Sequence, residues 1–330
     1  MRLILYLFCI VMLIFTVMLI SPSSNVTNYE QEIKNALSNQ EVLKIEQITT
    51  GLSDSKIYKV ILENQKIFIA RFLNTKRNFK EREWEISLMQ ETAKKSISPA
   101  IIYSSPSQDL IIMDYIDGKN FNQTFLGDPL LKKLASNLKI LHSIRIPEYT
   151  IKIETLEKKF FVKSSTQEYQ HFLSMFRALE KDFLANSTIT ITHTDLHPGN
   201  LLADKENVWI IDWQDAGLYG PLFDVVRVAL ELSLVLSPEQ ENAFLKDYFE
   251  REMTQEEITS YKKAKALVTM KIIDSLVHAY TKNSSEEDKN SKITELFTKA
   301  KLGIEITNPM QDQESLIIYL LKELFKAMGI

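Results

Sequence analysis

The 330-residue sequence contains few cysteines and glycines and no excess of basic residues, and each shortage excludes a class of protein. Its single cysteine, Cys9, cannot form an internal disulfide, and one thiolate cannot build a cysteine-based zinc cluster. Eight glycines exclude collagen-like and glycine-rich low-complexity chains. Because 39 Lys and Arg are balanced by 43 Asp and Glu, the net charge of -4 argues against a duplex nucleic-acid binder.

The sequence does contain enough apolar residues for a large core. About 45% of the residues are hydrophobic and 25% are charged, a composition that excludes wholesale disorder. The length allows one large domain or two ordinary ones. We therefore expect a folded globular protein, and we expect it to be an enzyme.

The N-terminal segment differs from the rest of the chain. Residues 3–20 read LILYLFCIVMLIFTVMLI, an apolar run that as a helix would reach about 27 Å, enough for a thin bilayer. Arg2 precedes the run and the polar stretch at 21–25 ends it. We expect residues 1–24 to form a membrane anchor. A cleaved signal peptide and a true start at Met18 are the alternatives.

Alternating apolar residues predict a small antiparallel sheet that carries one helix. A short amphipathic helix is expected at 29–43 and a longer helix at 79–93. Strands are expected at Val42–Ile48, Lys56–Leu62, Lys66–Phe72, Ala100–Tyr103 and Leu110–Tyr115. Together these elements define a predicted sheet lobe at residues 25–116.

After residue 116 the pattern changes to helices. Apolar stripes at helical spacing occur at Pro129–Arg145, Gln167–Ala185, Leu222–Leu236, Pro238–Glu250, Thr254–Lys282 and Gln313–Met328. We expect the last of these helices to pack within the protein, although its broad apolar stripe would also suit a lipid surface. The sequence thus predicts an α+β protein of two lobes, in which residues 117–330 form the helical lobe.

The residues that suggest chemistry lie in two neighbouring segments. In ITHTDLHPGNLL the Asp195 carboxylate lies on a loop, and the Asn200 amide follows five positions later. In VWIIDW, Asp212 ends an apolar strand. This set suits phosphoryl transfer from ATP, in which one carboxylate accepts a hydroxyl proton while an amide and a second carboxylate bind Mg²⁺. A loop-forming Asp–Asn pair is the alternative, and Asp212 at this distance argues against it.

The spacing His193-x-Asp195-x-x-x-x-Asn200, followed by IDW at 211–213, resembles the motifs of the aminoglycoside phosphotransferase and choline/ethanolamine kinase superfamily. The pattern is similar to that of bacterial choline kinases in particular. Members of this superfamily have a two-lobed, protein-kinase-like fold and phosphorylate small molecules. The resemblance covers residues 41–224 and weakens in the C-terminal helices.

This resemblance assigns a role to each of the three polar residues. It implies that Asp195 is the catalytic base, that Asn200 and Asp212 bind Mg²⁺, and that ATP is the phosphate donor. Asp224 resembles a family acid that braces the catalytic loop; capping its own helix is the alternative. We expect His193 to be a structural histidine.

The resemblance also implies a nucleotide site in the sheet lobe. Arg71, within FIARF, would occupy the position of the strand Lys or Arg that contacts the ATP phosphates. A solvated residue at a sheet edge is the alternative. Glu83 would be the helix acid that pairs with Arg71, and Glu85 is the second choice.

Two further segments would complete this nucleotide site. In the turn TGLS, Gly51 and Ser53 would cover the phosphates through backbone N–H groups and a hydroxyl. The segment MDYI resembles the hinge that binds adenine through backbone hydrogen bonds, which implies contacts at Asp114 and Ile116.

The residues after Asp212 bear on the acceptor. The tract at 211–224 resembles that of bacterial choline kinases and of thiamine and ethanolamine kinases, which commonly have Glu-Tyr where this chain has Gln-Asp. Trp213, Asp215 and Tyr219 remain available for a cationic amino-alcohol, because quaternary ammonium groups bind aromatic faces and carboxylates. We expect choline or ethanolamine as the acceptor. Thiamine and an aminoglycoside are the alternatives.

Two other functions fit part of the pattern. A catalytically silent ATP-binding scaffold tethered to a membrane would not need the intact set of Asp195, Asn200 and Asp212. A protein kinase would need a peptide platform, yet eleven residues separate Asp212 from Asp224. Because ATP is a cytosolic reagent, we expect the kinase domain to face the cytoplasm. Residues 3–20 would then supply any membrane association.

Overall fold

The computed structural model describes residues 26–49, 55–74, 76–120, 128–146, 156–232, 238–309 and 311–329. The hydrophobic N-terminal segment and the Gly51–Ser53 turn of the sequence analysis lie outside the described residues. Within these ranges, no helix combines the length and the apolar character that crossing a membrane requires.

The described chain forms two compact units. The sheet unit comprises the described residues up to 146 together with His197–Ala216, and the helical unit comprises those of 156–196 and of 217–329. This division differs from the expected boundary at residue 116, because the Asn200 and Asp212 segments belong to the sheet unit. Hydrogen bonds account for this: Asn137 Nδ2 donates to the Val208 carbonyl at 2.7 Å, and the Ile210 N–H donates to the Ile97 carbonyl at 2.8 Å.

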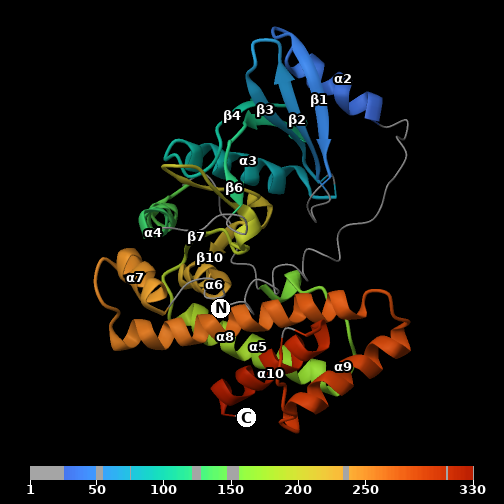
Figure 1. The fold of residues 1–330 in the computed structure, drawn as a ribbon, viewed down its shortest axis with the longest axis vertical. Coiled ribbons are helices and arrows are strands. Elements are labelled where there is room, and N and C mark those ends of the chain that lie inside the picture. The colour runs from blue at the N-terminus through green and yellow to red at the C-terminus, as the bar shows by residue number, and fades with distance from the viewer. Residues whose placement is uncertain are drawn as a thin grey trace. The chain divides into compact units, whose positions relative to one another are not determined.

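The main sheet of the sheet unit is antiparallel and has the strand order β1-β2-β3-β5-β4 (Figure 1). All five strands of the sequence analysis are confirmed, with ends shifted by at most one residue. The strands are β1 (Val42–Ile48), β2 (Lys56–Leu62), β3 (Ile67–Phe72), β4 (Ile101–Ser104) and β5 (Leu110–Asp114). In the register between β3 and β5, Arg71 lies opposite Ile111.

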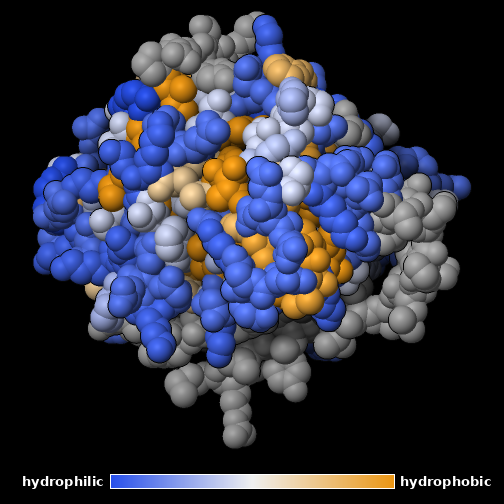
Figure 2. Space-filling view, turned by 90° about the horizontal axis from the view of Figure 1, so that it is seen from above, coloured by the Kyte–Doolittle hydropathy of each residue, from blue (hydrophilic) through white to orange (hydrophobic). Residues whose placement is uncertain are grey.

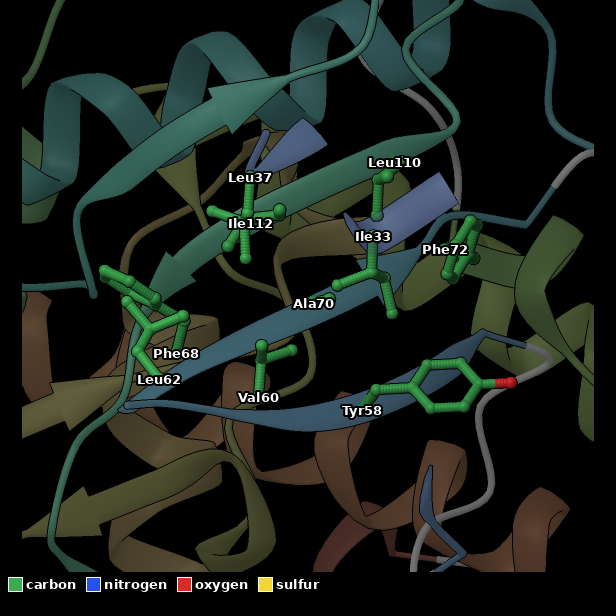
Figure 3. Close-up of a cluster of buried hydrophobic side chains, with 10 residues drawn as sticks. All are labelled: Ile33, Leu37, Tyr58, Val60, Leu62, Phe68, Ala70, Phe72, Leu110 and Ile112. Atoms are coloured by element: carbon green, nitrogen blue, oxygen red, sulfur yellow. The ribbon is translucent and has the colours of Figure 1, made fainter. Parts of the chain in front are cut away.

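Helix α2 (Val26–Ala36) covers one face of this sheet and forms a core with it (Figure 3). Ile33 and Leu37 pack there with side chains that alternate along three strands, since every second residue of a strand faces the same side. The strand residues are Tyr58, Val60, Leu62, Phe68, Ala70, Phe72, Leu110 and Ile112. The helix ends at Ala36 rather than at residue 43, because residues 37–40 turn the chain into β1.

Two helices and a second, three-stranded sheet complete the sheet unit. Helix α3 (Phe79–Ala93) begins with a capping box formed by Asn78 and Glu81. Helix α4 (Asp128–Ser143) precedes the second sheet along the chain. That sheet has the order β6-β8-β9, from strands β6 (Lys119–Asn120), β8 (Leu201–Ala203) and β9 (Val208–Ile210). Strands β8 and β9 form the hairpin that carries the predicted metal ligands.

The helical unit is built around α8 (Gln255–Thr281), which contacts α5, α6 and α10 (Figure 1). The other long elements are α5 (Gln167–Ala185), α6 (Leu222–Leu232), α7 (Pro238–Phe249), α9 (Glu286–Lys301) and α10 (Gln313–Met328). A two-stranded sheet pairs β7 (Thr190–Thr192) with β10 (Gly217–Tyr219). The apolar stripe of α10 is buried against α8 and α9, which confirms the packed terminal helix.

Helix α9 was missing from the sequence-based prediction. Its buried residues form a narrow stripe in an otherwise charged segment: Ile293, Leu296, Phe297 and Ala300. Such a stripe is weaker evidence of a helix than the broad stripe of α10.

Hydrophilic residues cover most of the face shown in Figure 2, with apolar residues gathered among them. Individual apolar side chains such as Leu43 and Leu302 are well exposed, as is normal for globular proteins.

The packing of α2 on the sheet predicts the effect of truncating Ile33, which has an exposed fraction of 0%. Ile33→Ala should lower the free energy of unfolding by roughly 2–5 kcal/mol, because it leaves a cavity between helix and sheet. The exposed neighbour Lys34 provides the control. Lys34→Ala should change the free energy of unfolding by less than about 0.5 kcal/mol. Urea denaturation measures both variants. Equal effects would contradict this packing.

Candidate active site

Arg71 is buried in the sheet unit and contacts two acidic residues. Phe72 and Ala70 point into the core beneath α2, so the alternation along β3 directs Arg71 to the opposite face. The residue is 4% exposed. Nη2 donates to Asp212 Oδ1 at 2.8 Å, and Nη1 lies 3.0 Å from Glu85 Oε1. Arg71 is therefore not a solvated edge residue.

The acidic partner of Arg71 on α3 is Glu85, so the prediction of Glu83 was wrong and its alternative was correct. Two positions along a helix correspond to a rotation of about 200°, which directs Glu83 away from the side occupied by Glu85. Glu85 lies one turn before Leu88 and Met89, both buried. That apolar stripe is visible in the sequence, and its spacing predicts that Glu85 faces the protein interior.

A second arginine, which the sequence analysis did not single out, also contacts Glu85. Arg77 Nη1 donates to Glu85 Oε2 at 2.7 Å. Burial raises the pKa of Glu85, while the guanidinium groups of Arg71 and Arg77 act in the opposite direction. The nearby carboxylates of Asp212 and Asp215 also raise the pKa of Glu85. The ionised form of Glu85 thus depends on both arginines.

The β8–β9 hairpin brings Asn200 and Asp212 together. Leu201 pairs with Ile210, and the Ile211 N–H donates to the Asn200 carbonyl at 3.0 Å. Asn200 is therefore opposite Ile211, the residue before Asp212. Asp212 has a φ of 63°, in the left-handed region that a non-glycine residue rarely adopts.

The donor atoms of this hairpin fit a magnesium ion. A carboxylate and an amide offer the hard oxygen ligands that Mg²⁺ prefers, and such sites are usually completed by water and phosphate oxygens. In the described part of the chain, no three His, Cys, Asp or Glu side chains form a metal cluster. Asn200 and Asp212 offer two such oxygen donors, and their role as Mg²⁺ ligands stays a prediction.

Asp195 belongs to the helical unit, on the loop after β7, and its side chain is 30% exposed. The fully buried Asp224 accepts hydrogen bonds from the N–H groups of His193 at 2.7 Å and Thr194 at 2.8 Å. This confirms that Asp224 braces the loop. His193 is also buried, and its Nδ1 accepts from the Asp195 N–H at 3.4 Å, which is a structural role.

Two lysines of the helical unit, neither of which the sequence analysis had identified, contact the same loop. Lys271 Nζ on α8 donates to the Thr194 carbonyl at 3.0 Å and lies 3.5 Å from Asp195 Oδ1. Lys159 Nζ donates to Thr194 Oγ1 at 3.3 Å. Lys271 lies 76 positions from Asp195, in a helix rich in lysine, so no sequence pattern distinguished it.

Two of the three residues expected to bind the acceptor are buried instead. Trp213 has an exposed fraction of 0%, and its Nε1 donates to the Ile210 carbonyl at 3.1 Å. The hydroxyl of Tyr219 donates to Glu180 at 2.9 Å, and burial together with the Glu180 charge raises the pKa of Tyr219. Both are core residues, which corrects their assignment as acceptor contacts. Asp215 is half-buried in the sheet unit.

The predicted hinge residues lie at the end of β5 and just after it. Asp114 ends β5, and its N–H donates to the Ala100 carbonyl at 2.9 Å. Asp114 and Ile116 are both half-buried, so their role in adenine binding stays a prediction.

Several solved structures share this fold. A choline/ethanolamine kinase family protein from Mesorhizobium loti is 16% identical, with a TM-score of 0.58 over 90% of this chain and 99% of its own. The choline kinase LicA from Streptococcus pneumoniae is 18% identical, with a TM-score of 0.58 over 82% and 99%. The amicoumacin kinase hAmiN, in complex with AMP-PNP, Ca²⁺ and Ami, is 13% identical, with a TM-score of 0.62 over 89% and 100%.

These structures establish a kinase-like fold, as the sequence predicted. No curated protein matches the chain in sequence. The model of the phosphotransferase enzyme family, APH, matches residues 44–258, more than half of the chain. With this match, the chain belongs to the phosphotransferase enzyme family.

Proposed function

We propose that this protein transfers the γ-phosphoryl group of ATP to the hydroxyl of a small alcohol. The observation that carries the proposal is the buried guanidinium of Arg71, which contacts both Glu85 and Asp212. A cation held by a helix acid, beside a carboxylate suited to Mg²⁺, is the arrangement that protein-kinase-like enzymes use for ATP phosphates.

The proposal assigns nucleotide binding to residues of the sheet unit. Arg71 binds phosphate oxygens, and Glu85, which also pairs with Arg77, keeps its guanidinium in place. Asn200 with Asp212 would hold Mg²⁺. When bound, the ion neutralises negative charge on the phosphate oxygens. The half-buried Asp215 adds negative charge near this group.

The proposal assigns proton transfer to a residue of the helical unit. Asp195 accepts the proton of the acceptor hydroxyl while the hydroxyl oxygen forms a bond to the γ-phosphorus. The bond from that phosphorus to the β–γ bridging oxygen breaks, and ADP leaves with the bridging oxygen. Asp224 fixes the backbone of the loop through two hydrogen bonds, so that Asp195 is already oriented before the substrate binds.

For the acceptor we propose choline or ethanolamine, with thiamine or an aminoglycoside as the alternatives. The support is the resemblance of residues 211–224 to choline kinases, together with two solved structures of similar fold that are described as choline or ethanolamine kinases. Because Trp213 and Tyr219 are buried, recognition of a cationic group has to come from other residues. Because ATP is a cytosolic reagent, we expect the reaction to take place in the cytoplasm.

The first test measures ADP release by the full chain with Mg-ATP and separate acceptors. The panel contains choline, ethanolamine, thiamine, an aminoglycoside and a generic protein substrate. We expect turnover on one small alcohol, and Asp195→Asn should lower it by roughly 10²–10⁴-fold because the proton acceptor is lost. ATP binding without turnover on any acceptor would favour the silent scaffold. A folded protein that binds no nucleotide would contradict the proposed site.

A second test compares two substitutions on α3. Glu85→Gln should weaken ATP binding by roughly tenfold, because Arg71 and Arg77 lose the carboxylate that holds them. Glu83→Gln removes a charge from the same helix and should leave the Kd of ATP unchanged within about twofold. Isothermal titration with Mg-ATP measures both variants, and thermal melts verify their folding. If both variants bind ATP equally well, Glu85 does not organise the phosphate site.

A further inference from the structure

The loop that carries Asp195 contains a strained residue. Thr194 has a φ of 63°, and for a β-branched side chain the left-handed region is a genuine outlier. Such a conformation persists only where the surroundings hold it firmly, and it is often found at functional sites. The contacts around Thr194 should therefore show what keeps Asp195 in its orientation.

Each polar group of Thr194 makes a hydrogen bond. Its N–H donates to Asp224, its hydroxyl accepts from Lys159, and its carbonyl accepts from Lys271. The contact of Lys271 differs from the other two, because the same ammonium also lies 3.5 Å from the Asp195 carboxylate. Lys271 is thus the side chain that joins the backbone constraint to the predicted catalytic group.

The burial of Lys271 makes this contact energetically significant. The residue is 7% exposed, and a buried ammonium has to be compensated by hydrogen bonds or an opposite charge. It is anchored on α8, which packs against α5, α6 and α10. One turn further along α8, the buried Asp274 accepts hydrogen bonds from the Phe161 and Val162 N–H groups and from the Tyr169 hydroxyl. The position of Lys271 is therefore set by a rigid helix.

We propose that Lys271 is a positioning residue for Asp195. Its ammonium fixes the Thr194 carbonyl and attracts the Asp195 carboxylate, so that the proton acceptor stays in one orientation. This inference rests on the proposed function, in which Asp195 accepts the hydroxyl proton. Because the residues assigned to ATP belong to the sheet unit, loss of Lys271 should affect kcat and leave the KM for ATP unchanged.

A double-mutant cycle of Lys271→Met and Asp195→Asn tests the proposal. Methionine preserves the length of the side chain and removes its charge. In the wild-type background, Lys271→Met should lower kcat by about 10–100-fold, as losses of supporting contacts do at other sites. In the Asp195→Asn background it should lower kcat by less than about twofold, because residues that act as one unit are not additive. An equal loss in both backgrounds, or no loss in the wild type, would overturn the proposal.

The control lies on the same helix. Lys263 Nζ contacts Asp182 at 2.5 Å, so Lys263→Met removes a lysine–carboxylate pair that does not involve the loop. Its kcat should stay within about twofold of the wild type. A loss as large as that of Lys271→Met would show that any charge removed from α8 has the same effect, and would refute a specific role.

Thermal melts of the same variants separate this proposal from the proposed function. If the wild type transfers phosphate to no acceptor, the proposed function fails. The double-mutant cycle can still be carried out, with melting temperatures measured in place of kcat. The Tm shifts of Lys271→Met and Asp195→Asn should not sum to that of the double variant, because the two side chains interact. Additive shifts would overturn the contact itself, whatever the activity.

Discussion

The cost of burying charge is the constraint on which this structure depends. A guanidinium taken out of water is tolerated only where carboxylates and hydrogen-bond acceptors surround it. Arg71 is almost fully buried on β3, so Glu85 and Asp212 have to lie where they do. Arg77 then balances the second oxygen of Glu85. One cation on a strand thus connects α3 with the segment after β9.

The same constraint operates in the helical unit, with the backbone as the partner. Asp224 and Lys271 are buried, and they bind opposite ends of the short stretch from His193 to Asp195. Charged groups bound to backbone N–H and carbonyl groups form stronger hydrogen bonds than neutral side chains do. The energy gained there can hold Thr194 in a conformation that it would otherwise leave. Each unit thus uses buried charge to keep one polar side chain in place.

Local patterns predicted the fold better than they predicted the partners of each residue. Period-two alternation defined all five strands of the main sheet, and broad apolar stripes identified α5 and α10, because burial on one face leaves a regular signature. Helix α9 lacks that breadth and was missed. Position within the family motif favours Glu83, whereas the apolar stripe that contains Leu88 favours Glu85, and the structure agrees with the stripe.

Long-range contacts explain the remaining differences. Lys271 and Asp195 are 76 positions apart, and no local pattern records such a pair. Trp213 and Tyr219 were expected at the acceptor because aromatic rings bind cations, yet large rings also fill cores, and both are buried. Asp195, Asn200 and Asp212 could be predicted from the sequence because their spacing along a loop and a strand is itself the motif, and their roles stay predictions.

The two-pronged contact of Arg71 restricts how this site can change over evolutionary time. One guanidinium nitrogen reaches Glu85 and another reaches Asp212, and only a planar, forked cation offers two such donors in a fixed arrangement. A lysine at this strand position has a single charged atom and would have to give up one of the two acids. Exchange of arginine for lysine is neutral at many surface sites. At position 71 it should not be neutral unless α3 or the segment after β9 changes in the same lineage.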